Sequence, residues 1–208
     1  MRFKDRTDAG NQLAKKVTIA DSENAVVLAL PRGGIPLGVS ISNLHDIPLD
    51  VVLAKKITHP LQTEFAIGAV AESGHPIKNP NAIVKDEWVE TELPNVREEI
   101  QRRRDLYQEI LPKQSFKEKD VVIVDDGIAT GMTMFAAIEA IKEEQPSRLT
   151  IAVPIIPKDT YKKLKKLVDD VYFIDVPNQF HGAVGAYYQR FPQISDDTVS
   201  DILKQHAQ

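Results

Sequence analysis

The sequence predicts an α/β fold in which helices flank a parallel sheet. Short aliphatic segments alternate along the chain with segments whose apolar residues recur at helical spacing, and this alternation is typical of parallel strands joined by helices. Residues 121–124 are four consecutive aliphatic residues, which predicts a strand buried on both faces. We therefore expect a layered domain with its sheet in the centre.

The expected elements follow one another closely. Pro36 suits the first turn of a helix that follows the first strand. The expected strands are 25–30, 49–54, 121–124, 149–153 and 171–174, and the other expected helices are 7–17, 96–110, 134–144 and 159–167. We find no internal repeat and no linker, so residues 1–208 are treated as one domain.

Residues 57–94 interrupt the alternation. Residues 65–71, followed by Ser73-Gly74 and residues 76–78, predict a hairpin outside the main sheet. Such a flap could close over a site or could cover a sheet edge, and the sequence favours neither.

Composition limits the function. The net charge of −4 gives no electrostatic footprint for nucleic acid. The absence of cysteine excludes disulfides and thiolate zinc sites. No apolar segment reaches the roughly 18 residues of a membrane span, and the charged start does not resemble a signal peptide. We expect a cytoplasmic protein with neither nucleic-acid nor membrane partners.

The expected helix at 96–110 carries interleaved charges, which usually indicate a solvated face. These charges are Arg97, Glu98, Glu99, Arg102, Arg103, Arg104, Asp105 and Glu109.

Residues 121–133 predict a strand, a tight loop and the start of a helix. Gly127 and Gly131 permit backbone angles that turn several N–H groups to one concave side. Thr130 and Thr133 add hydroxyls beside the positive end of the helix dipole. The loop is therefore a predicted anion site.

Two acids stand beside this anion site. At about 4 Å and an effective dielectric of about 20, a carboxylate repels a unit anion by roughly 4 kcal/mol, so Asp125 and Asp126 should face another group. Ionised carboxylates only accept hydrogen bonds, and the adjacent hydroxyls of ribose donate two. The pattern indicates ribose 5-phosphate. Met132 stands where a nucleoside triphosphate loop of the Walker type would have lysine.

Residues 121–133 resemble the phosphoribosyl pyrophosphate signature of type I phosphoribosyltransferases. The resemblance implies a Rossmann-like sheet flanked by helices, a flap at about 57–94, and a hood formed by about 175–208 with the N-terminal segment. It also implies that the acids hold the ribose hydroxyls and the loop holds the 5-phosphate. The residues concerned are Asp125, Asp126, Gly127, Ile128, Ala129, Thr130, Gly131, Met132 and Thr133. An ordinary strand-to-helix turn would not require both threonines and the second glycine.

Two basic loops should meet this loop, because ligands of open parallel sheets bind beyond the carboxyl ends of the strands. Arg32 offers a fork of donors for phosphate, and Gly33-Gly34 allows backbone N–H groups to approach closely. This segment resembles the pyrophosphate loop of the same family. In an extended strand Lys55 and Lys56 point to opposite sides, and we favour Lys56 for the site.

The expected chemistry is transfer through a cationic sugar and an anionic leaving group. Arg32, Lys56 and a magnesium ion carried by the diphosphate would stabilise the departing oxygens. Asp125 and Asp126 would favour the cationic sugar, so these four residues are the predicted catalytic set. No metal site made by the protein alone is expected, and Glu64 is a candidate base without an assigned role.

Residues 177–191 form the densest aromatic region and are the expected acceptor end. Phe180 could stack on a flat heterocycle or close the core, whereas Tyr187 and Phe191 are expected in the core. His181 could transfer a proton, although a surface position is commoner. Together with the 64–69 segment, this arrangement resembles predicted transferases whose acceptor is unknown.

The leading hypothesis is a phosphoribosyltransferase that uses 5-phosphoribosyl 1-pyrophosphate and a small acceptor, a nitrogen heterocycle. A regulator that binds the same donor without turnover is the alternative, and an unrelated phosphate-binding α/β protein is the third. The expected partners are small molecules, and a homodimer is a candidate assembly.

Overall fold

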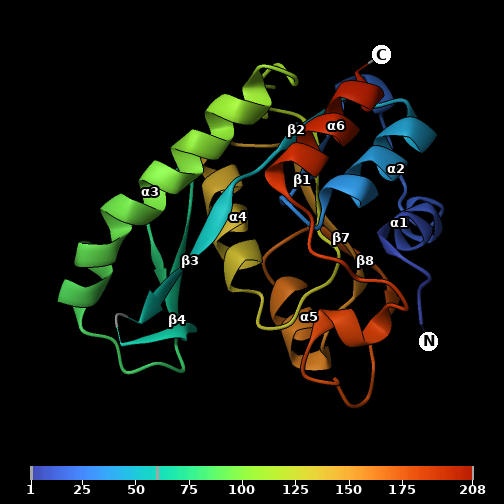
Figure 1. Ribbon diagram of the computed structural model, residues 1–208. Helices are drawn as coiled ribbons and strands as arrows, with labels where there is room; N and C mark the ends of the chain where they lie inside the picture. Colours follow the sequence, from blue (N-terminus) through green and yellow to red (C-terminus); the bar gives the residue numbers. More distant parts are fainter. Residues whose placement is uncertain (1, 60, 208) are drawn as a thin grey trace.

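The computed structural model describes residues 2–59 and 61–207 (Figure 1). The side chains of residues 62–64 lie outside this description. The role considered for Glu64 therefore stays a prediction.

The core of the protein is a five-stranded sheet in the order β2-β1-β6-β7-β8. All four strand pairs are parallel, as predicted. The strands are β1 (Ala25–Ala29), β2 (Leu49–Val51), β6 (Asp120–Val124), β7 (Arg148–Ile155) and β8 (Asp170–Asp175).

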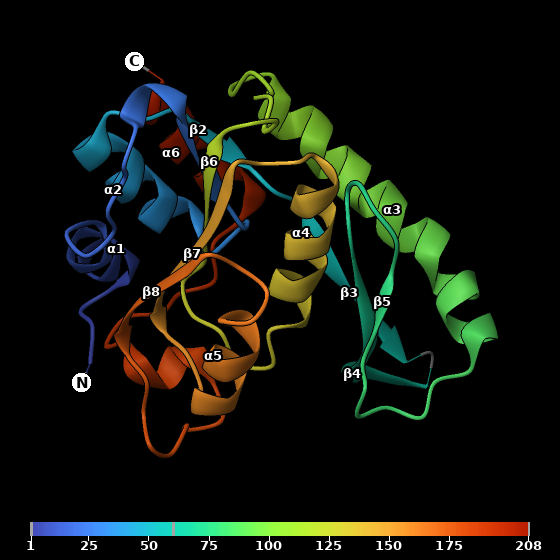
Figure 2. The ribbon, with the colours of Figure 1, turned by 180° about the vertical axis from the view of Figure 1, so that it is seen from behind.

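Helices cover both faces of this sheet, which confirms the predicted layers (Figures 1 and 2). Residues of α1 (Arg6–Ala14) and α2 (Ile35–His45) pack on one face, and residues of α4 (Met132–Glu143) and α5 (Lys158–Leu164) pack on the other. Alternate strand residues point to opposite faces, so Val27 joins the first cluster and Leu28 the second. None of the helices in the described residues is both long and apolar enough to cross a bilayer.

The register of β1 and β6 determines where the two main loops meet. Ala25 lies opposite Asp120 and Ala29 opposite Val124. The two strands therefore end side by side, and the loop after β1 starts next to the acidic pair.

A second, antiparallel sheet has three strands, β3 (Ala54–His59), β4 (Gln62–Ala71) and β5 (Ile77–Lys78). The single strand predicted at 49–54 is wrong, because the main-sheet strand ends at Val51 and Lys55 and Lys56 lie inside β3. The physical reason is that Val52 and Leu53 stay buried where the chain leaves this edge strand, so apolar character alone does not mark the change of sheet.

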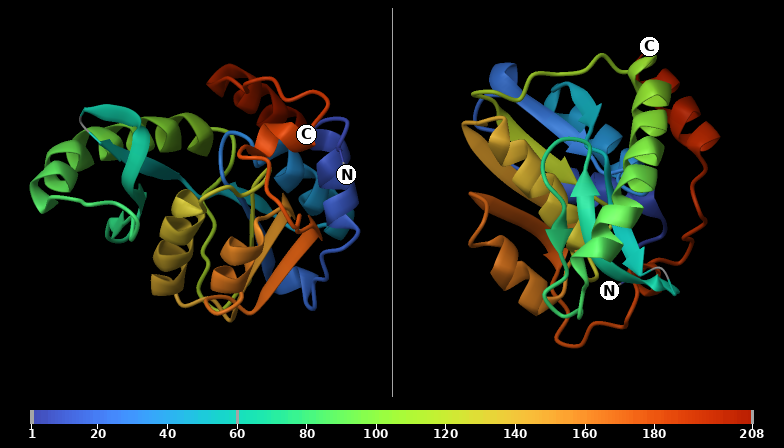
Figure 3. Two further views of the ribbon diagram at one scale, coloured as in Figure 1. Left: turned by 90° about the horizontal axis from the view of Figure 1, so that it is seen from below. Right: turned by 90° about the vertical axis from the view of Figure 1, so that its left-hand side faces the viewer.

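The small sheet lies between two helices (Figure 3). Ala69 and Ala71 face Ala136 of α4, while Ile67 and Val70 belong to the cluster that contains residues of α3 (Asp86–Gln108). Helix α3 begins well before the predicted residue 96 and contains Pro94. Because a proline usually ends a helix, the sequence does not indicate that the helix begins before Pro94.

The N-terminal segment and the C-terminal region lie together, as a hood requires. The backbone N–H of Phe3 donates to Tyr187, and that of Gln189 donates back to Phe3, both at 2.8 Å. A short 3-10 helix, η2 (Val184–Tyr187), precedes this pairing, and α6 (Asp196–His206) then contacts α2. A further 3-10 helix, η1 (Ser22–Asn24), leads into β1.

A buried ion cluster joins α3 to the main sheet. Nη1 of Arg104 lies 3.1 Å from Oδ1 of Asp50, and its Nε donates to Glu72 at 2.7 Å. The Arg104 residue is only 5% exposed and Asp50 is fully buried. The interpretation of this helix as a solvated face is therefore wrong for Arg104, since its side chain reaches Asp50 in β2 and Glu72 directly after β4.

We expect Arg104→Met to lower the free energy of unfolding by about 3 to 5 kcal/mol, because it leaves Asp50 buried without a cation. Denaturant unfolding would measure this loss. As a control, Arg190→Met removes a pair with Asp5 whose arginine side chain is 74% exposed, and should cost less than about 1 kcal/mol. Equal losses would contradict a stabilising role for the buried cluster.

Candidate functional site

The acidic pair and the Arg32 loop touch each other. A Cβ atom at Gly33 would lie 2.0 Å from Oδ2 of Asp126, and one at Gly34 would lie 2.6 Å from the carbonyl oxygens of Leu30 and Val124. No side chain larger than hydrogen fits at either position without a shift. The structure thus brings together Gly33 and Asp126, which the sequence assigned to one site.

An arginine that the sequence did not indicate binds the acidic pair. Nε of Arg6, in the first turn of α1, donates to Oδ2 of Asp126 at 2.7 Å. Its guanidinium lies 3.7 Å from the ring centroid of Phe191, and its Nη1 donates to the carbonyl of Pro192. Arg6 is separated from Asp126 by most of the chain, and no local spacing signals their contact.

Burial makes both acids of the pair weaker than usual. It raises the pKa of Asp125 well above its ordinary value, and the charge of Asp126 adds to the effect. The pKa of Asp126 is also raised by burial, although the hydrogen bond and charge of Arg6 oppose the rise. Arg6 therefore helps to keep Asp126 ionised, the state in which it accepts hydrogen bonds from a diol.

The loop after the acidic pair has the backbone of an anion site. Gly131 has a φ of 79°, a left-handed conformation that favours glycine, and α4 starts at the next residue. Within the described chain, no hydrogen bond is donated by the backbone N–H groups of Ala129, Thr130 or Gly131. These donors lie beside the positive end of the α4 dipole, so they are available for a phosphate.

Two residues of the predicted phosphate loop have side chains in the core. Ile128 is 3% and Met132 5% exposed, and each packs in a hydrophobic cluster. The side chain of Ile128 faces the core, and that of Met132 packs beside a neighbouring cavity, so a role of either residue in the phosphate loop would be through its backbone. Thr130, by contrast, is exposed, and Thr133 is half-buried.

A cavity of about 440 Å³ lies against the acidic pair, a size typical of small-molecule sites. Its lining combines charged groups with apolar walls. The lining residues are Arg6, Arg32, Gly33, Asp126, Val184, Phe191, Gln193 and Ile194. Arg32, Gly33 and Asp126 therefore share one cavity with residues of the hood.

The two lysines of β3 point to opposite faces of the small sheet. Lys55 forms an ion pair with Glu99 on α3, and burial, followed by the charges of Arg103 and Arg102, lowers its pKa. Lys56 lies opposite Ala69, on the face that packs against α4. This face adjoins the helix that starts at the phosphate loop, which supports the choice of Lys56.

The aromatic residues of the hood pack on the core, and one of them also lines the cavity. Phe180 stacks on Tyr187, with ring centroids 5.5 Å apart, and the backbone N–H of the exposed His181 donates to the Tyr187 hydroxyl. Phe191 packs on the core, as expected, and it also lines the cavity beneath Arg6. Phe191 thus lines the cavity that contains Asp126, while the hydroxyl of Tyr188 donates to the carbonyl of Asp126 at 2.6 Å.

The described residues include no group of three or more His, Cys, Asp or Glu side chains that could hold a metal ion. The one acidic pair near Arg32 offers two carboxylates.

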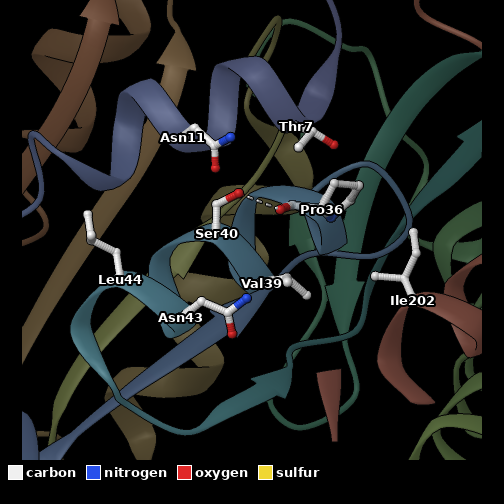
Figure 4. A pocket seen from close by; sticks show the side chains of 8 residues that line it. All are labelled: Thr7, Asn11, Pro36, Val39, Ser40, Asn43, Leu44 and Ile202. Atoms are coloured by element: carbon white, nitrogen blue, oxygen red, sulfur yellow. Dashed lines mark hydrogen bonds between the residues drawn. The ribbon is translucent and has the colours of Figure 1, made fainter. Parts of the chain in front are cut away.

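A separate cavity of about 500 Å³ lies among α1, α2 and α6 (Figure 4). Its walls contain no ionisable side chain, and the hydroxyl of Ser40 donates to the carbonyl of Pro36, which also lines the cavity. It lacks the charges that a sugar phosphate requires.

Residues 4–189 match the family described as phosphoribosyl transferase domain. A Mycobacterium tuberculosis protein, Rv0571c, provisionally named a phosphoribosyl transferase, is 35% identical over 206 residues, which cover 97% of this chain. These residues cover 46% of that protein, so the chain spans about half the length of its curated relatives.

Solved structures agree with this match. The crystal structure of TT1426 from Thermus thermophilus is 38% identical, covers all of both chains and superposes with a TM-score of 0.82. The AQ2163 protein of Aquifex aeolicus has a TM-score of 0.50 at 13% identity, covering 82% of this chain and 74% of its own. The second likeness concerns the fold alone.

We expect Gly33→Ala to weaken binding of ribose 5-phosphate by about tenfold or more, because the Asp126 carboxylate must move away from the new methyl group. Isothermal titration calorimetry would measure the affinity. Gly182→Ala is the control, since Gly182 has a φ of 81° but open space around it. It should strain the backbone without changing ribose 5-phosphate affinity, and an equal loss in both variants would contradict the proposed contact.

We expect the affinity for ribose 5-phosphate to fall as the pH is lowered. The fall should begin at a higher pH than it would if both aspartates had their ordinary pKa. The pKa values of Asp125 and Asp126 are raised, and the diol requires the ionised form, so binding is present above these values and lost below them. Arg6→Gln removes the cation that lowers the pKa of Asp126. It should therefore move the midpoint of this loss to higher pH. A pH series of titrations showing no movement would remove Arg6 from this role.

Proposed function

Because the chain belongs to the phosphoribosyl transferase family, we propose that it transfers a phosphoribosyl group from 5-phosphoribosyl 1-pyrophosphate to a small acceptor. The acceptor class we propose is a nitrogen heterocycle, and pyrophosphate is the second product. The enzyme is a pentosyltransferase in this proposal.

One observation supports the proposal above the others. The two acids and the N–H groups of the loop follow one strand. Groups that can accept hydrogen bonds from a diol and groups that can donate hydrogen bonds to a phosphate therefore stand a few residues apart. Asp126 contacts Arg6 at 2.7 Å, and the N–H groups of Ala129 to Gly131 make no hydrogen bond within the described chain. A ribose 5-phosphate satisfies both groups at once.

The protein would lower the barrier by holding charges in place. When the bond from ribose C1 to the diphosphate breaks, its electron pair stays on the diphosphate oxygen. The acceptor nitrogen forms the new bond to C1 and gives its proton to the departing pyrophosphate. Arg32 and Lys56 would stabilise the leaving oxygens, and Asp125 and Asp126 the cationic sugar. Bound magnesium supplies charge neutralisation on the diphosphate.

The remaining parts follow the same proposal. Residues 1–208 act as one transferase domain, in which residues 57–94 are the flap and residues 175–208 with the N-terminal segment are the hood. The partners are small molecules, the location is cytoplasmic, and a homodimer is the proposed assembly. Phe180 and Phe191 are the aromatic residues proposed for the acceptor end, and the cavity lining favours Phe191.

We expect Asp126→Asn to weaken binding of phosphoribosyl pyrophosphate by about 10- to 150-fold, because a charge-assisted hydrogen bond contributes about 1.5 to 3 kcal/mol. Calorimetry with magnesium would measure the change. Asp46→Asn is the matched control, because Asp46 is exposed and has a left-handed backbone that Asn tolerates.

Turnover separates the enzyme from a regulator that binds the same donor. Incubation with the donor and a mixture of purines, pyrimidines and their precursors, followed by mass spectrometry, should show a mass gain of one phosphoribosyl group on one of them. Tight donor binding without any product would favour the regulator. Unchanged affinity in Asp126→Asn would contradict the donor site itself.

A further inference from the structure

Three arginines converge on one carboxylate at the edge of the proposed donor site. Asp196, the first residue of α6, accepts a hydrogen bond from Arg102 at 3.0 Å. Nε of Arg103 lies 3.6 Å and Nη1 of Arg32 3.9 Å from its other oxygen, Oδ1. The hydroxyl of Tyr107 donates to that same oxygen at 3.0 Å. Asp196 therefore joins α3, α6 and the loop after β1.

The positive charge at this point exceeds what Asp196 can neutralise. Three guanidinium groups surround a single carboxylate, and the nearby Lys55 has its own partner in Glu99. Nε of Arg103 is buried and makes no hydrogen bond within the described residues. A buried donor without a partner is costly, so this cluster has an unmet capacity for an anion.

The cluster adjoins the cavity of the acidic pair. Arg32 lines that cavity together with Asp126, and so does Ile194, two residues before Asp196. An anion attached to a sugar held at Asp126 would meet Arg32 in this cavity, and Arg32 shares the carboxylate of Asp196 with the arginines of α3. The group attached to the sugar would therefore bind at Arg32 and the adjoining arginine cluster.

Asp196 is held as an anion in the free protein. Burial opposes its ionisation, but hydrogen bonds from Arg102 and Tyr107 and the charges of Arg103 and Arg32 outweigh that effect, so the pKa of Asp196 lies below its usual value. A permanent carboxylate among three guanidinium groups occupies the position that a phosphate oxygen could take.

We propose that Arg102 and Arg103 of α3 form, with Arg32, a binding site for the diphosphate, and that Asp196 fills this site until the diphosphate arrives. The proposal rests on the proposed function, since it names residues for the leaving group of the same donor. Diphosphate carries several negative charges, so it displaces the single carboxylate of Asp196 from the guanidinium groups. Because α3 also packs on the small sheet, binding would connect the flap to the hood.

A test separates the diphosphate from the sugar. The full chain is titrated calorimetrically with magnesium pyrophosphate and, independently, with ribose 5-phosphate. Arg103→Met should weaken pyrophosphate binding by about tenfold or more and leave ribose 5-phosphate affinity unchanged. Arg97→Met is the matched control, because it removes the same charge from the same helix where the side chain donates to the carbonyl of Gly74, and it should change neither affinity.

Asp196→Asn gives the second, opposite readout. Removing the competing carboxylate should strengthen pyrophosphate binding by about fivefold or more, whereas a purely structural Asp196 would leave it unchanged or weaken it. If Arg103→Met does not fold, Asp196→Asn decides alone.

Three results would overturn the proposal while leaving the proposed function intact. They are equal pyrophosphate affinity in Arg103→Met and Arg97→Met, weaker or unchanged pyrophosphate binding in Asp196→Asn, and absence of pyrophosphate binding by the unsubstituted chain. Loss of ribose 5-phosphate binding by the unsubstituted chain would instead contradict the proposed function.

Discussion

The parallel pairing of β1 with β6 is the constraint on which the site depends. It ends both strands at the same level, so that the loop at Gly33 meets the carboxylate of Asp126. Only a glycine permits that approach without a shift, and the burial of the sheet's faces fixes the register that holds the two loops together. The chemistry of the site therefore follows from strand alignment before any charged side chain is considered.

The charges of the site then define two kinds of region, one that binds uncharged hydroxyls and one that binds anions. Carboxylates held in a partly buried place accept from uncharged hydroxyls, and backbone N–H groups at the start of α4 attract an anion. Arg6 supports the acidic region of the site. Its charge reduces the free-energy cost of burying the Asp126 carboxylate, and its flat guanidinium covers the ring of Phe191. A region with surplus positive charge begins at Arg32 and continues onto α3.

Local sequence was sufficient for the main sheet and the loops that follow its strands. Residues 121–133 encode strand, turn and helix within a few positions, so neighbours in the chain are neighbours in space. The same is true of Gly33-Gly34. Where the chain left the main sheet after Val51, the aliphatic pattern continued into β3 and concealed the change of sheet.

The contacts that local sequence could not indicate are those between distant elements. Arg6 and Asp126 are 120 positions apart, and Arg103 meets Asp196 only because α3 crosses from the flap to the hood. Arg104 resembled its solvated neighbours on the same helix, yet it is buried against Asp50. Helical spacing shows which residues share a face, whereas the element that covers that face is decided by tertiary packing.

The most direct test of this account is a crystal structure of the chain with ribose 5-phosphate bound. The account predicts both ribose hydroxyls on the carboxylates of Asp125 and Asp126, with the phosphate against the backbone N–H groups between Gly127 and Thr133. A phosphate bound instead at Arg6 or Arg32, with the sugar hydroxyls away from both acids, would contradict it.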